Sequence, residues 1–233
     1  MQLLIASTST VFGQPYLQYM ASQVQSFFPN RSRILFIPYA RPAGTTYDEY
    51  TKKATDTFIN WNYQMRSVHS FASGAEALDW AQGVFTGGGN TFLLLKTLYD
   101  TGLFPLLDQK VRAGLRYFGT SAGSNIAGIS IGTTNDMPIT YPPSLQAFGW
   151  LPFNLNPHYL DPIAGSTHMG ETRATRIAEF HHFNPQPVIG LREGSWLQVK
   201  GDSITLKGPH TARWFTPQKD AIELQTESPV PSK

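Results

Sequence analysis

The chain has 233 residues, of which 41% are hydrophobic and 15% charged, and its formal net charge is +2. This length predicts one large domain, and so small a net charge excludes the basic surface typical of nucleic-acid binding. The absence of cysteine excludes disulfides, thiolate metal sites and a cysteine nucleophile, and it favours a cytoplasmic location. The first residues lack the pattern of a signal peptide and no apolar run has membrane-spanning length, so we expect no membrane partner.

The hydrophobic pattern predicts strands that alternate with helices along most of the chain. Short apolar runs predict strands at 3–7, 33–38, 65–71, 84–86, 115–118 and 187–191. Helical spacing predicts helices at 15–28, 46–61, 73–81, 104–113 and 171–182, and further helices that begin at 91 and after 121. This order predicts an α/β fold with a mainly parallel sheet and helices on both faces.

The last third of the chain has a different texture. Residues 129–157 are rich in Pro, Gly, Thr and Asn and predict a long loop region. Alternating residues at 196–199, 203–206 and 212–215 predict a C-terminal antiparallel hairpin or meander. We therefore expect a single α/β domain over residues 1–225 and a mobile tail over 226–233, which contains two prolines.

A G-x-S-x-G pattern, Gly119 to Gly123, stands between a predicted strand and a predicted helix. Strand, sharp turn and helix form the context of a nucleophile elbow, in which Ser121 would present its hydroxyl above the sheet. The N–H group of Ala122 would then face the negative charge of an oxyanion. The alternative is a turn rich in small residues with no chemistry, because the pattern is short.

A second glycine-rich turn, Gly87-Gly88-Gly89, follows the strand at 84–86. It lacks the Lys-Ser/Thr of a phosphate-binding loop, because Asn90 is followed by Thr91-Phe92. We expect Gly88 or Gly89 to donate a second N–H group to an oxyanion, as in esterases, and Asn90 or Thr91 to cap the next helix. A purely structural tight turn is the alternative.

A serine nucleophile needs a base and an acid that orients the base. Of six histidines, His158 stands apart, because it follows Pro157 in the loop region beyond the elbow. Glu193 lies just past the strand at 187–191, whereas Asp136 would satisfy the α/β-hydrolase order of nucleophile, acid and histidine. The residues alone leave this choice open. No metal-ligand spacing is present, and we expect neither a metal nor a cofactor.

Six motifs along the chain carry a family resemblance. They are Gly-Gly-Gly-Asn-Thr-Phe (87–92), Gly-Thr-Ser-Ala-Gly-Ser-Asn (119–125), Thr-Thr-Asn-Asp-Met-Pro-Ile (133–139), Asn-Pro-His (156–158), Gly-Glu-Thr-Arg (170–173) and Glu-Gly-Ser-Trp-Leu-Gln-Val (193–199). Together they resemble the peptidase E family, the α-aspartyl dipeptidases of serine peptidase family S51. The resemblance implies a three-layer, flavodoxin-like fold similar to that of class I glutamine amidotransferases.

The resemblance also implies the roles of several residues. It favours the order Ser121, His158, Glu193 for the catalytic triad. Arg173 matches the family position that reads the side-chain carboxylate of an N-terminal aspartate, and a guanidinium suits that task because it binds carboxylates bidentately. Asp136 and Asn90 are candidate ligands of the substrate's α-amine.

The implied activity is removal of an N-terminal aspartate from dipeptides, so the expected partner is a small peptide substrate. The oligomeric state is left open between monomer and homodimer. Two other readings are a cyanophycinase-like hydrolase, against which the acid-poor loop at 129–165 argues, and a non-catalytic anion binder that uses Gly87 to Gly89. Arg192 directly precedes Glu193 and would weaken it as the acid if the guanidinium paired with its carboxylate.

Overall fold

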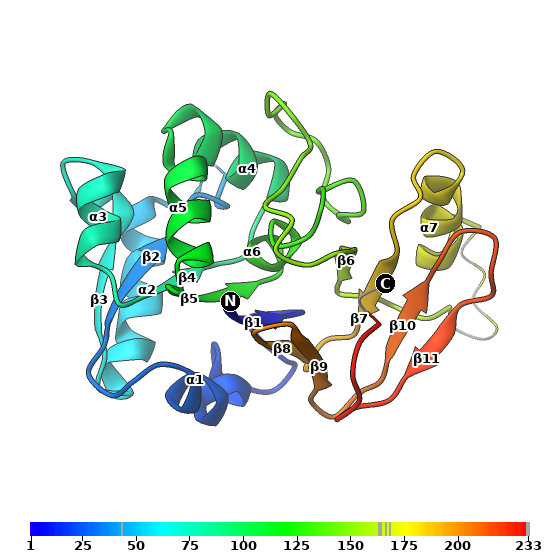
Figure 1. Cartoon of the computed structure of the whole chain (residues 1–233), viewed down its shortest axis with the longest axis horizontal. Coiled ribbons are helices and arrows are strands. Elements are labelled where there is room, and N and C mark those ends of the chain that lie inside the picture. Colours follow the sequence, from blue (N-terminus) through cyan, green and yellow to red (C-terminus); the bar gives the residue numbers. More distant parts are fainter. Residues whose placement is uncertain (43, 163–164, 166, 168, 232–233) are drawn as a thin grey trace.

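The computed structural model describes residues 1–42, 44–162, 165, 167 and 169–231 of the chain. Within them two β-sheets lie side by side, and helices cover both faces of the larger one (Figure 1). The predicted α/β architecture with a mainly parallel sheet is confirmed. The second sheet is an element that the sequence pattern does not predict.

The larger sheet has seven strands in the order β3-β2-β4-β5-β1-β8-β9. Their bounds are β1 (Gln2–Ala6), β2 (Arg33–Ile37), β3 (Gln64–Ser67), β4 (Gly83–Thr86), β5 (Arg116–Thr120), β8 (Trp196–Lys200) and β9 (Ser203–Lys207). The first five in sheet order are parallel, whereas β8 and β9 are antiparallel. Ala6 lies opposite Thr120, so the segments that leave β1 and β5 start from the same edge of the sheet.

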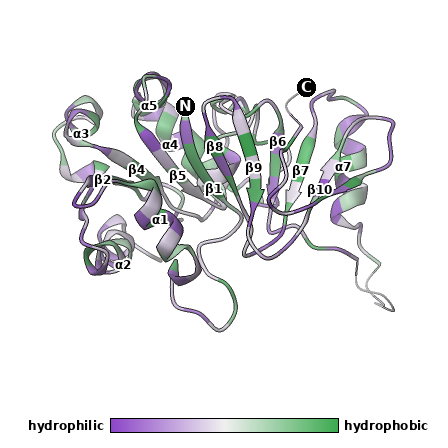
Figure 2. Ribbon diagram, turned by 60° about the horizontal axis from the view of Figure 1, so that its bottom comes forward, coloured by the Kyte–Doolittle hydropathy of each residue, from purple (hydrophilic) through white to green (hydrophobic). Residues whose placement is uncertain are grey.

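Helices pack on the two faces of this sheet. Their bounds are α1 (Ala21–Phe27), α2 (Tyr47–Asn60), α3 (Gly74–Trp80), α4 (Thr91–Asp100), α5 (Leu103–Arg112), α6 (Ala122–Asn125) and α7 (Arg173–His181), with single 3-10 turns at Gln18–Met20 and Val68–Ser70. Figure 2 shows α3 and α5 on one side of the larger sheet and α1 and α2 on the other. The helix predicted at 15–28 is thus a 3-10 turn followed by a shorter α-helix.

The core follows from the alternation of side chains along each strand. Leu3 and Ile5 of β1 belong to the cluster that includes the buried faces of α3, α4 and α5. Leu4 and Ala6 belong to the cluster that includes those of α1 and α2. In α2, Tyr50, Ala54 and Phe58 recur every four residues and are buried, so the helix presents one apolar stripe to the sheet.

The smaller sheet has four strands, in the order β11-β10-β7-β6. They are β6 (Asn154–Pro157), β7 (Val188–Leu191), β10 (Ala212–Phe215) and β11 (Ile222–Leu224). β6 and β7 are parallel and are connected through α7, whereas β10 and β11 add antiparallel strands. β6 lies inside the region predicted as loop. A strand forms there because its Asn154 and Asn156 are buried and bond to the backbone of Ser130 and Thr133.

The predicted C-terminal meander is divided between the two sheets. β8 and β9 form an antiparallel hairpin in the larger sheet, but β10 pairs with β7 in the smaller one. Gly208, with φ of 106°, and Pro209 separate β9 from β10, and proline removes a donor that a continuing ladder would need. The Trp214 ring then packs edge-on against Phe153, with ring centroids 5.1 Å apart.

The tail predicted as mobile is docked over residues 227–230. The N–H of Glu227 donates to Leu206 O at 2.8 Å, and that of Val230 donates to Ile204 O at 2.9 Å. The Val230 side chain is buried in the main core cluster. The tail prediction is therefore wrong for these four residues, because one valine and a set of backbone bonds attach them to β9. Ser232 and Lys233 lie outside the described residues.

Deletion of residues 227–233 will lower the free energy of unfolding by about 2 kcal/mol, the scale of one buried valine side chain. Urea denaturation monitored by circular dichroism measures the change. A matched deletion of residues 231–233 keeps the bonds to β9 and should leave the midpoint unchanged. Equal midpoints for the long deletion and the full chain would show that the docked segment adds nothing.

Candidate active site

Ser121 occupies a strained turn between β5 and α6. Its φ and ψ are 52° and −110°, outside the conformations that residues other than glycine usually adopt. Its N–H donates to Ala6 O at 3.1 Å, and its carbonyl accepts the N–H groups of Ser124 and Asn125 at 2.9 Å each. These bonds hold the turn from both sides.

Both glycines of the elbow are required by close packing. A Cβ atom on Gly119 would collide with the carbonyl of Gly123, and one on Gly123 would collide with the carbonyl of Thr86. The helix that follows Ser121 is a single turn, Ala122–Asn125. The elbow thus has the geometry expected of a G-x-S-x-G nucleophile turn.

His158 connects Ser121 to Glu193. Its Nε2 lies 2.9 Å from Ser121 Oγ, and its Nδ1 lies 2.6 Å from Glu193 Oε1. A carboxylate only accepts hydrogen bonds, so Nδ1 carries the proton and the neutral ring leaves Nε2 as the acceptor of the serine proton. The side chains of His158 and Glu193 are 37% and 49% exposed, which leaves the chain of bonds accessible from solvent.

Ser7, which directly follows β1, supports this arrangement. The sequence pattern does not predict this role of Ser7. Its Oγ accepts the N–H of His158 at 2.9 Å and donates to Leu191 O at 2.7 Å. The residue is fully buried. The only signal was its place in a polar run at the carboxyl end of a strand. Ser7 therefore joins the larger sheet to the ends of β6 and β7.

The glycine turn after β4 lies beside the nucleophile. A Cβ atom on Gly88 would be 3.0 Å from Ser121 Cβ, and Gly88 O accepts the Tyr50 hydroxyl at 3.1 Å. Gly89 has φ of 144°, and a side chain there would collide with Ala40 O. Among the described residues, none accepts the N–H of Gly88, Gly89 or Ala122. The three N–H groups thus have no internal hydrogen-bond acceptor in the described part of the chain.

Asp136 is not the acid of this site. Its Oδ2 accepts the N–H and the hydroxyl of Thr91 at 2.7 and 2.6 Å and the hydroxyl of Thr134 at 3.2 Å. The carboxylate thereby caps the start of α4, where negative charge is favourable. The α/β-hydrolase order considered for Asp136 is wrong for this chain, because Glu193 is the carboxylate bonded to His158.

Asn90 also has a structural task. Its Oδ1 accepts the N–H of Leu93 at 3.0 Å as the cap of α4, and its Nδ2 donates to Met137 O at 2.8 Å. Asn90 and Asp136 together attach the loop 133–139 to the start of α4. Both atoms of the Asn90 amide are thus engaged inside the protein, and so is one carboxylate oxygen of Asp136.

Arg173 is the first residue of α7 and is half-buried. Burial lowers the pKa of its guanidinium, and the nearby charge of Arg176 lowers it further. Within the described part of the chain, no carboxylate pairs with Arg173 and no contact joins it to the Ser121–His158–Glu193 chain. Arg173 is therefore a partly desolvated cation with no hydrogen bond or ion pair to the other site residues in the described part of the chain.

A second Ser-His-Asp chain exists at the end of β3. Ser67 Oγ lies 2.6 Å from His69 Nδ1, and His69 Nε2 lies 2.8 Å from Asp48 Oδ1. Ser67 is 2% exposed and does not lie on a strained elbow, so a substrate carbonyl has no access to it. This chain links the start of α2 to β3 and is structural.

Two properties of the described residues bear on the site. No helix there combines the length and the apolar character that crossing a membrane requires. No group of three or more His, Cys, Asp or Glu side chains among them is arranged to hold a metal ion.

Removal of the Ser7 hydroxyl should destabilise the fold. Ser7→Ala leaves the buried N–H of His158 and the carbonyl of Leu191 without their partner, which costs about 1–3 kcal/mol. Ser9→Ala is the matched control, since no hydrogen bond of the Ser9 side chain is present among the described residues. Urea unfolding of both variants measures the difference, and equal midpoints would contradict the bridging role of Ser7.

Comparison with known proteins gives a consistent result. The family model described as Peptidase family S51 matches residues 3–207. A protein named Peptidase E from Streptomyces coelicolor is 48% identical over 92% of this chain and 87% of its own length. A probable alpha-aspartyl dipeptidase from Drosophila melanogaster is 43% identical over 95% of this chain and 92% of its own length.

Solved structures support the fold. The crystal structure of a peptidase from an acI-B1 actinobacterium superposes with a TM-score of 0.72 at 16% identity, over 98% of this chain and 96% of the other. At this identity the likeness shows the arrangement of helices and strands alone. It extends over 98% of the chain and therefore covers both sheets.

Proposed function

The chain belongs to peptidase family S51, and on that premise we propose that it is a serine dipeptidase that hydrolyses dipeptides with an N-terminal aspartate. The observation that carries the proposal is the continuous hydrogen-bond chain from Ser121 through His158 to Glu193. The substrate class is supported by the name of the Drosophila relative and by the half-buried cation of Arg173.

The reaction begins with proton transfer. His158 Nε2 takes the proton of Ser121, whose Oγ attacks the carbonyl carbon of the substrate's aspartyl residue. The new negative charge on the carbonyl oxygen is held by the N–H of Ala122 and by that of Gly88 or Gly89. Glu193 stabilises the imidazolium that forms on His158.

Three further transfers complete the cycle. His158 gives its proton to the leaving amine as the C–N bond breaks, so the second residue of the dipeptide departs and an aspartyl ester remains on Ser121. His158 then accepts a proton from water, whose oxygen attacks the ester carbon. When the ester bond breaks and aspartate leaves, His158 returns this proton to Ser121 Oγ. Each step uses the one imidazole, first as base and then as acid.

Arg173 is assigned to the side-chain carboxylate of the substrate's aspartate. A guanidinium that is partly removed from water and lacks a carboxylate partner gains most from a bidentate anion. Asp136 and Asn90 act indirectly in this proposal, because they hold the loop 133–139 against α4. The expected cytoplasmic location and the choice between monomer and homodimer stay predictions.

Hydrolysis of Asp-Leu and of Leu-Leu tests the reaction and its specificity together. We expect the wild-type protein to cleave Asp-Leu far faster, and Ser121→Ala to lower kcat by about 10⁴-fold or more, as loss of a triad nucleophile does elsewhere. Release of leucine is measured by amine derivatisation. Equal rates on both dipeptides would contradict the aspartyl specificity, and full activity in Ser121→Ala would contradict the mechanism.

The role of Arg173 has a matched control on the same helix. Arg173→Met should lower kcat/KM for Asp-Leu by about 100-fold, because it removes a charged hydrogen-bond partner of roughly 2–3 kcal/mol. Arg176→Met removes the same charge from an exposed position three residues later and should leave kcat/KM near the wild-type value. Equal effects of the two substitutions would assign the specificity to another residue.

A further inference from the structure

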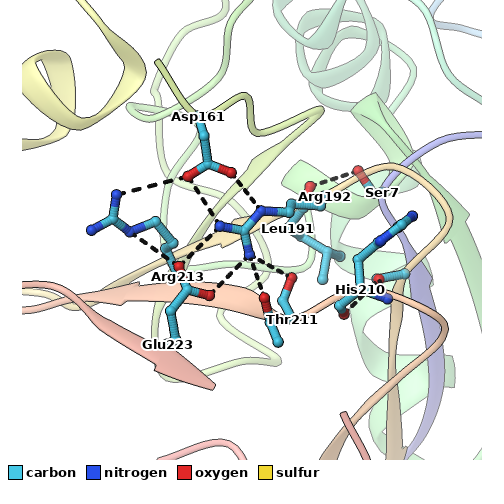
Figure 3. A network of polar contacts seen from close by, with 9 residues as sticks. Ser7, Asp161, Leu191, Arg192, His210, Thr211, Arg213 and Glu223 are labelled. Atoms are coloured by element: carbon cyan, nitrogen blue, oxygen red, sulfur yellow. Dashed lines mark hydrogen bonds and ion pairs between the residues drawn. The ribbon is translucent and has the colours of Figure 1, made fainter. Parts of the chain in front are cut away.

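An ion-pair network surrounds the residue that precedes Glu193 in the chain, as Figure 3 shows. At its centre is Arg192, the residue before Glu193. Its Nε and Nη2 donate to the two carboxylate oxygens of Asp161 at 2.7 and 3.0 Å. Its Nη1 and Nη2 donate to those of Glu223 at 3.0 and 2.9 Å. Nη1 also donates to Thr211 O and Oγ1, so every nitrogen of the guanidinium is engaged.

The network is balanced in charge. Arg213 of β10 lies 3.8 Å from Asp161 and 3.4 Å from Glu223, so two cations face two anions. Hydrogen bonds from Arg192 lower the pKa of both carboxyl groups, and these carboxylates raise the pKa of Arg192. The Arg192 side chain is 19% exposed, so solvent screens its pairs less than it screens those on the surface.

The ion pair and the catalytic hydrogen bond join the same two segments. Asp161 is three residues after His158, and Arg192 is one residue before Glu193. A ring of a few residues is therefore closed by two contacts, His158–Glu193 and Asp161–Arg192. A third contact crosses the ring, since the N–H of Tyr159 donates to Leu191 O at 3.1 Å. The two segments that carry His158 and Glu193 are thus held together at further points next to the His158–Glu193 bond.

The ring also holds a strained residue. His158 has φ of 54°, a left-handed conformation that costs of order 1–3 kcal/mol for a residue other than glycine. Such a conformation persists only where the flanking residues are fixed. On one side its N–H is fixed by Ser7, and on the other the chain is fixed at Asp161 by Arg192.

We propose that Asp161 and Arg192 are positioning residues for the reaction. Their bidentate ion pair fixes the direction in which Glu193 meets His158, and it keeps the Arg192 guanidinium away from the Glu193 carboxylate. Without Asp161, the adjacent guanidinium has free donors that compete for Glu193 and withdraw it from His158. The proposal rests on the proposed roles of Ser121, His158 and Glu193 and adds to them the groups that aim the acid.

The test is a double-mutant cycle on kcat for Asp-Leu. Asp161→Asn keeps the shape of the side chain but removes its charge. We expect it to lower kcat about tenfold, as small misplacements of catalytic groups do, and to change KM less than about twofold. Because Asp161 acts through Glu193, the same substitution in a Glu193→Gln background should lower kcat further by less than about twofold.

A matched control separates positioning from stability. Asp108 of α5 accepts a hydrogen bond from Arg112 Nε, which lies 2.9 and 3.0 Å from its two carboxylate oxygens. It also accepts the indole N–H of Trp150. It contributes to no bond of the catalytic chain. Asp108→Asn should lower the melting temperature and leave kcat per folded protein unchanged. Arg192→Lys keeps the positive charge but removes the bidentate hydrogen bonds of the guanidinium. It replaces Asp161→Asn in the cycle if that variant does not fold.

The outcomes separate the two proposals. If Glu193→Gln keeps the wild-type kcat, the proposed role of Glu193 as the acid fails. If Glu193→Gln lowers kcat but neither Asp161→Asn nor Arg192→Lys does, the positioning proposal fails alone. An equal fold-loss in both backgrounds would show that Asp161 acts independently of Glu193 and would also overturn the positioning role.

Discussion

The hydrogen bonds of the Ser7 hydroxyl are the constraint on which the site depends. Ser121 is carried by the larger sheet, whereas His158 and Glu193 follow strands of the smaller one. A serine and an imidazole interact only when their atoms lie within about 3 Å, so the two sheets must meet in one relative position. Within the core that the two sheets share, Ser7 fixes the position of the site, because its one oxygen bonds to His158 and to Leu191 at the ends of β6 and β7.

The same edge of the structure stores backbone strain. Ser121 and His158 both have positive φ, and neither is a residue that adopts this conformation readily. The strain is sustained by close packing around the elbow glycines on one side and by Ser7 and the Arg192 ion pairs on the other. The two residues joined by the Ser121–His158 hydrogen bond are therefore held by their neighbours and not by their own conformational preference.

Much of the larger sheet could be predicted from the sequence, since apolar runs and helical periods mark its strands and helices. The elbow was also predictable, because Gly119 and Gly123 flank Ser121 at the end of a strand. The smaller sheet was not, because β6 reads Asn-Leu-Asn-Pro and lacks a hydrophobic pattern. Its buried asparagines form hydrogen bonds with residues 130–135 of a preceding loop, and such a partner is invisible to local periodicity.

The site was predictable in part for the same reason. Local residues suggested Ser121 and His158, but the choice between Glu193 and Asp136 needed the family resemblance. A carboxylate near a predicted helix start can be a cap or a catalytic acid, and the contacts of Asp136 with Thr91 give it the first role. Ser7 carried no motif at all. Its role arises because Ser7 bonds to His158 and to Leu191, which lie 151 and 184 positions later in the chain.

The division of the site between two sheets has a consequence for how the protein loses activity. The smaller sheet has four strands, and both His158 and Glu193 follow strands of this sheet. A local opening that shifts this sheet separates His158 from Ser121 while the seven-stranded sheet and most of the helical signal persist. On heating, catalysis should thus cease before the bulk of the secondary structure melts. The turnover rate therefore reports loss of the contact between the two sheets more sensitively than a circular dichroism signal averaged over the whole chain.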